Sequence, residues 1–118
     1  MPFVINWATD VLFLNHSLVR AQFLKRGQVY TLRAHRRKLE GLQILVQGSR
    51  FKHRPVGRGL VILARELKKL TPRALAPFVR HSGFKSAKDW LEAYRRLNGG
   101  KCIEPAFLYQ VTRLKAKR

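Results

Sequence analysis

The chain has 118 residues, 46% of them hydrophobic, and its 25 lysines and arginines against six aspartates and glutamates give a formal net charge of +19. This length suits one domain, here residues 1–118, and the apolar fraction excludes wholesale disorder. No apolar run reaches the about 18 residues of a membrane-spanning helix, and the one cysteine, Cys102, excludes an internal disulfide and a cysteine-rich zinc site.

The positive charge points to a polyanionic partner. So much like charge destabilises a compact state unless salt or a polyanion screens it, and solubility alone needs a net charge of only about 2–8. A pI near 11.6 therefore predicts nucleic acid, RNA or DNA, as the partner. We see no long basic amphipathic helix for a membrane surface and no signal peptide, so we expect a cytoplasmic protein with no membrane partner, monomeric by default.

The first elements follow from apolar bursts and helix-capping residues. Residues 11–14 indicate a buried strand, whereas 3–7 fit either an edge strand or an arm. Asn15, His16 and Ser17 are typical helix-start residues, so we expect a helix over 18–26 that Gly27 ends.

A strand over 28–34 follows, with the two-residue period of a β-strand. One face, expected in the core, carries Tyr30, Leu32 and Ala34; the other carries Val29, Thr31, Arg33 and His35. Because Thr31 and Arg33 share a face, they are candidates to flank one phosphate or base edge; the alternative is a solvated strand face.

The middle of the chain alternates strands and turns. A basic loop over 35–41 leads to a strand over 42–47. Residues 50–55 alternate cations and rings and break at Pro55, 57–59 form a turn, and the apolar run 60–64 predicts a strand buried on both faces.

The last third contains two capped helices and a strand. Thr71 and Pro72 predict the start of a short helix that ends near residue 77 or 80. Ser86 predicts the cap of an amphipathic helix whose apolar stripe is Phe84, Ala87, Trp90, Leu91, Tyr94 and Leu97, with Glu92 paired to Arg96 and Trp90 and Tyr94 in the core. Residues 98–100 end it, and 107–112 form a strand. This order predicts an α+β fold around a small mixed or antiparallel β-barrel with about three short helices.

Three segments resemble the ASCH domains of the PUA-like superfamily, over about residues 11–114. They are FLKRGQVYTLR at 23–33, similar to the family pattern G-x-K-x-x-E/T-x-R; GLVILAREL at 59–67, followed by Leu-Thr-Pro; and SGFKSAKDWL at 82–91. The resemblance implies a PUA-like β-barrel that binds RNA rather than DNA. In the alignment with the family pattern, Thr31 occupies the position that is glutamate or threonine, and Arg33 occupies the position of the arginine.

The resemblance also bears on catalysis. Amidase-type members use the motif lysine, the threonine and a glutamate before the capped helix. Here Gln28 takes the place of the lysine and residues 79–83 contain no carboxylate, so we expect a binding protein rather than an amidase. A ribonuclease using His35 or His53, or a structural ribonucleoprotein component, remains an alternative.

The candidate nucleic-acid-binding residues belong to a basic cleft beside the 28–34 strand. One wall is Lys25, Arg26 and Arg33, the other is Arg36, Arg37, Arg50, Lys52 and Arg54, and Gln28 and Thr31 complete the set. Phe51 either stacks on a base or points into the core. The four histidines lack metal-ligand spacing, Cys102 has no arrangement typical of a nucleophile, and the six scattered acidic residues form no paired-carboxylate site. We therefore expect no metal, no cofactor and no catalytic residue.

Overall fold

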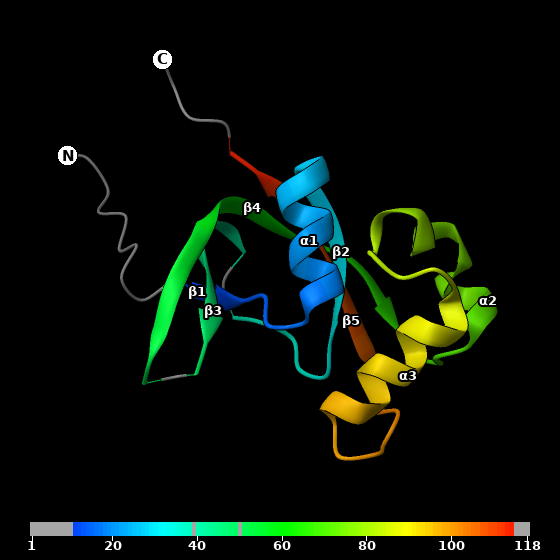
Figure 1. Ribbon diagram of the computed structural model, residues 1–118. Coiled ribbons are helices and arrows are strands. Elements are labelled where there is room, and N and C mark those ends of the chain that lie inside the picture. The colour runs from blue at the N-terminus through cyan, green and yellow to red at the C-terminus, as the bar shows by residue number, and fades with distance from the viewer. Residues whose placement is uncertain (1–10, 39, 50, 115–118) are drawn as a thin grey trace.

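The computed structural model describes residues 11–38, 40–49 and 51–114. The expected strand or arm at 3–7, the basic tail at 115–118 and the candidate residue Arg50 lie outside the described residues. The elements are, in chain order, β1 (Val11–Phe13), α1 (Ser17–Arg26), β2 (Gln28–Arg33), β3 (Gly41–Gly48), β4 (His53–Leu67), α2 (Pro72–Leu75), the 3₁₀-helix η1 (Ala76–His81), α3 (Ala87–Leu97) and β5 (Ala106–Arg113) (Figure 1).

The five strands form one sheet in the order β1-β3-β4-β5-β2. β1 runs parallel to β3, and the three other pairs are antiparallel. β1 and β2 are the two edges, so the described strands form an open sheet and not the closed barrel that the sequence led us to expect. The α+β class and the three helices are confirmed, and no helix among the described residues has the length and apolarity to cross a bilayer.

α1 begins and ends where local chemistry dictates. The Nδ1 atom of His16 accepts a hydrogen bond from the backbone N–H of Leu18 (3.2 Å), and Gly27 ends the helix in the left-handed conformation at φ 76°. Val19 and Phe23 are buried against β2 and β5, which places α1 across one face of the sheet (Figure 1).

β4 is one long strand, so the predicted break at Pro55 and the turn at 57–59 are wrong. Pro55 is tolerated because it lies beside a bulge, where the register with β3 shifts between Leu45 and Val46. Gly59 lies so close to β5 that a Cβ there would come within 3.0 Å of the Thr112 carbonyl oxygen. These residues serve strand packing, which a local pattern does not reveal.

The far half of β4 is covered on one face only. Val61 is fully buried, but Ile62 is 44% exposed, so the prediction of burial on both faces is wrong. Buried and exposed side chains therefore alternate along this part of β4.

α2 and α3 start as predicted. The hydroxyl of Thr71 accepts from the N–H of Ala74, and that of Ser86 accepts from the N–H of Asp89 (both 3.1 Å). Trp90 and Tyr94 are buried in the core, as expected from the apolar stripe.

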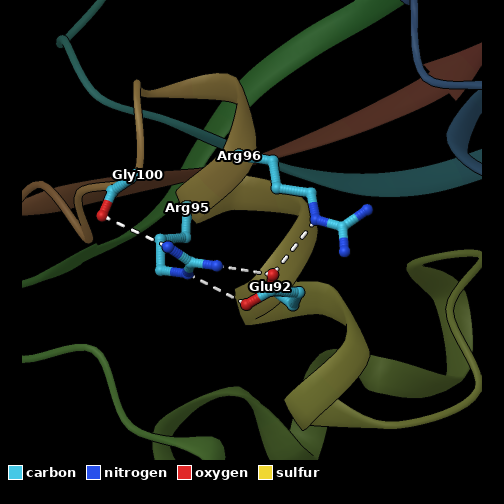
Figure 2. A network of polar contacts seen from close by, with 4 residues as sticks. All are labelled: Glu92, Arg95, Arg96 and Gly100. Atoms are coloured by element: carbon cyan, nitrogen blue, oxygen red, sulfur yellow. Dashed lines mark hydrogen bonds and ion pairs between the residues drawn. The ribbon is translucent and has the colours of Figure 1, made fainter.

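The polar side of α3 carries an arginine pair on one glutamate. Glu92 binds Arg96 (3.1 Å), as predicted, and also Arg95 (2.6 Å) (Figure 2). Hydrogen bonds from Arg95 and then from Arg96 lower the pKa of Glu92 to about 2. The stripe itself ends earlier than predicted, because Leu97 is 69% exposed.

Candidate functional site

The structure separates the predicted cleft residues into three places. Lys25 and Arg26 are exposed at the end of α1, and Gln28 begins β2 beside them; Thr31, Arg33, Arg36 and Arg37 lie at and beyond the other end of β2; Lys52 and Arg54 are exposed at the β3–β4 hairpin. They do not form two walls along one strand.

The end of α1 is joined to the end of β5. The N–H of Arg113 donates to the Gly27 carbonyl oxygen (2.8 Å), and its Nη1 donates to the Leu24 carbonyl oxygen (2.7 Å). Arg113 therefore lies beside Lys25 and Arg26, and it was missed because no signal in the sequence relates positions 89 residues apart. The N–H of Leu114, in turn, donates to the carbonyl oxygen of Arg58 on β4 (3.0 Å).

The β3–β4 hairpin presents an aromatic ring to solvent. Ser49 and Lys52 close the turn through backbone hydrogen bonds of 2.9 and 3.2 Å, and the intervening Phe51 is 94% exposed. The core alternative for Phe51 is therefore wrong. His53 packs edge-on against Phe13, with ring centroids 5.5 Å apart, and its Nδ1 lies 3.1 Å from the Ser49 carbonyl oxygen.

The described acidic residues lie away from the exposed cations at the end of α1 and at the β3–β4 hairpin. None falls in α1, β3, the hairpin, residues 53–65 of β4, or β5. Glu66 pairs with Phe107, at the opposite end of the β4–β5 ladder from Arg113. Negative charge from the described residues therefore does not cancel the positive potential over the hairpin and the end of α1.

The face of β2 that we expected to be open is turned inward. Val29 is fully buried and Thr31 is only 6% exposed. The reason is that helical segments cover both faces of this edge strand: Tyr30 packs edge-on against Phe78 of η1 (5.1 Å between centroids), and α1 covers the opposite face.

Arg33 is an enclosed cation. Its Nη2 donates to the Phe13 carbonyl oxygen (2.6 Å), while its buried Nε has no hydrogen-bond partner. Burial, and after it the neighbouring positive charge of Arg37, lower the pKa of Arg33 to about 10, and Tyr109 opposes the change. The guanidinium nevertheless stays charged at neutral pH.

Arg37 joins three strands. Its Nη2 donates to the Val11 carbonyl oxygen (2.8 Å) and to Oε1 of the buried Gln43 (2.6 Å), and its N–H donates to the Tyr109 hydroxyl (2.7 Å). β1, β3 and β5 thus meet at Arg37. The side chain of Arg37 links β1 to β3 and its backbone N–H adds the link to β5, whereas Arg36 next to it is exposed.

A cavity of about 240 Å³ lies between α1, α3 and β2. Its lining was not predicted as a site, because it combines residues from distant segments: apolar Val19, Phe84, Trp90 and Ala93 with polar His16, Thr31 and Arg33. Across the described part of the chain, no group of three or more His, Cys, Asp and Glu residues gathers to hold a metal.

No protein-family model, no curated protein and no solved structure matches this chain. Geometry and charge distinguish two places on the molecule: the exposed cations at the hairpin and the end of α1, and the cavity at Arg33.

Proposed function

We propose that this protein binds single-stranded or looped RNA on a basic surface formed by Lys25, Arg26, Lys52, Arg54 and Arg113, with Phe51 as a stacking platform. The observation that carries the proposal is the 94% exposure of Phe51 next to Lys52 on a hairpin. A ring so exposed contributes nothing to the core, and aromatic rings among cations are what unpaired bases stack on.

The arrangement of the cations supports a path for a backbone. β4 leads from the hairpin toward the ends of α1 and β5 (Figure 1), and Arg54 and Arg58 are exposed along it. At a rise of about 3.3 Å per residue along a strand, the six steps from Lys52 to Arg58 span about 20 Å. Phosphates lying along this path meet lysine and arginine and none of the described carboxylates.

The choice of RNA rests on the resemblance to ASCH domains, and a PUA-like type for this open sheet is part of the same proposal. The interface differs from the predicted cleft in its members. Arg33 and Thr31 are enclosed, so the proposed surface replaces them with Arg113 and Phe51.

The test is a fluorescence anisotropy titration of a labelled single-stranded RNA over a series of salt concentrations. Each phosphate contact contributes about −0.7 to the slope of log affinity against log salt for single strands. The double variant Lys52→Ala/Arg54→Ala should therefore make the slope shallower by about 1.4 if both side chains contact phosphate.

The matched control is Arg73→Ala/Lys88→Ala, which removes the same charge from exposed positions on α2 and α3. It should leave the slope unchanged. Phe51→Ala should weaken binding by about 1–3 kcal/mol per stacked base without changing the slope, and Phe51→Tyr should restore it. Equal effects of the two double variants would refute the surface and leave a general polycation.

A further inference from the structure

We propose that the cavity at Arg33 binds a small organic carboxylate with an apolar ring. This inference does not depend on RNA binding, because the cavity shares no residue with the basic surface. It rests on the volume of the cavity, the chemistry of its walls and the unsatisfied state of the arginine.

The size and shape admit a ligand with one ring. The volume of about 240 Å³ lies somewhat below the about 300–1,000 Å³ of sites for drug-sized molecules. The rim includes the exposed residues Asn15 and Leu97, so the cavity opens to solvent. Phe84 and Trp90 lie nearly parallel, with centroids 6.3 Å apart, and Val19 and Ala93 complete an apolar wall.

The charged end of the cavity is cationic. Arg33 and Phe13 both line it, and the guanidinium of Arg33 donates to the Phe13 carbonyl oxygen. A guanidinium has five N–H donors, and that bond uses one of them. Among the described residues no carboxylate offsets the charge of Arg33, whose pKa is lowered by burial and Arg37 and raised by Tyr109. A buried cation in this state is unfavourable until an anion joins it.

The remaining polar groups also favour an acceptor. His16 uses its Nδ1 as the acceptor for the N–H of Leu18. In the neutral ring the proton is then on Nε2, and burial and the charge of Arg20 lower the pKa of His16, which favours the neutral form. Thr31 adds a hydroxyl, and no described acidic residue lines the cavity. The cavity thus combines a cation and neutral donors with an aromatic wall, which selects an anion with an apolar body over a cation.

The experiment is isothermal titration calorimetry of the full chain with phenylacetate, its neutral isostere phenylacetamide, inorganic phosphate and uridine monophosphate. We expect saturable binding of phenylacetate and at least tenfold weaker binding of the amide. In a Trp7→Phe background, Trp90 is the only indole of the chain, so a change in its fluorescence places the ligand in the cavity.

Variants complete the test. Arg33→Met should abolish phenylacetate binding and Arg33→Lys should weaken it, whereas Arg54→Met on the basic surface should leave it unchanged. Ala93→Leu fills the cavity while Arg33 stays, so it should abolish binding in a chain whose circular dichroism is unaltered. Equal affinity for amide and carboxylate, no saturation by phenylacetate, binding of phosphate or the nucleotide alone, or full binding by Arg33→Met or Ala93→Leu would each overturn the proposal. The RNA titration is read separately, so neither failure is mistaken for the other.

Discussion

Replacing Arg33 by methionine should leave the fold as stable as before or slightly more stable, although it removes a buried hydrogen-bonding side chain. Methionine has a similar length and an apolar, adaptable shape. The substitution removes a charge that is enclosed beside Arg37 and loses the bond to the Phe13 carbonyl oxygen. The outcome depends on which of these two effects is larger.

The structure allows both effects to be sized. The pKa of Arg33 falls from 12.5 to about 10, and because one pH unit is worth about 1.4 kcal/mol, the environment disfavours the charged form by about 3 kcal/mol. A hydrogen bond to a charged group contributes about 1.5–3 kcal/mol. The difference predicts a change between zero and a gain of about 1.5 kcal/mol in the free energy of unfolding.

Urea denaturation followed by circular dichroism measures this change. An unchanged m value shows that the variant exposes the same surface on unfolding as the native chain. Arg37→Met is the comparison: it removes the side-chain donor to the buried Gln43 of β3 and to the Val11 carbonyl oxygen of β1, so it should lose about 2 kcal/mol or more. A loss above about 2 kcal/mol for Arg33→Met, or a loss equal to that of Arg37→Met, would refute the reasoning.

The pH dependence gives an independent check on the same side chain. A cation whose pKa is lowered on folding destabilises the fold at every pH below the folded value, and this penalty is relieved as the pH rises through about 10. Any stability advantage of Arg33→Met over the native chain should therefore shrink above pH 10.

Two further predictions concern the helices around the cavity. Gly83→Ala should lower the free energy of unfolding by about 2–4 kcal/mol, because φ is +91° there and an added Cβ would meet the Leu18 carbonyl oxygen. Gly99→Ala, which has positive φ but open space around it, should lower it by only about 1 kcal/mol, and thermal unfolding measures both changes. The Glu92 carboxyl should titrate near pH 2 by NMR, so its contribution to stability is present above its ordinary pKa and is lost as the pH falls through about 2. Arg95→Gln should raise the titration midpoint of Glu92, and a midpoint near 4.5 in the native chain would contradict the ion-pair geometry.

The helices were predictable because their signals are local. Gly27, Thr71 and Ser86 act within three or four residues of themselves and appear as caps where the sequence predicts them, and His16 is the one of three adjacent helix-start residues that caps α1. The course of β4 was not predictable. The proline and glycines within it are turn residues by local rules, and only pairing with β3 and β5 makes them part of a strand.

The candidate site was predictable in composition but not in place. The net positive charge can be counted from the sequence, and the exposure of the hairpin cations can be predicted from it because a lysine or arginine rarely enters a core. The exceptions are Arg33 and Arg37, which were expected on an open cleft. Two-residue periodicity correctly separates the faces of β2, but it does not say that α1 and η1 cover both of them.

The two kinds of arginine in this chain should therefore respond to different ligands. Arg54 and Arg113 are exposed, so a phosphate that binds them displaces counterions, and the affinity falls with salt. Arg33 is enclosed, is screened little by salt and already carries a desolvation penalty that a single buried carboxylate would offset. A net charge of +19 counts these groups equally. Burial separates them, and for this reason we propose a polyanion for the hairpin and the end of α1 and a small anion for the cavity at Arg33.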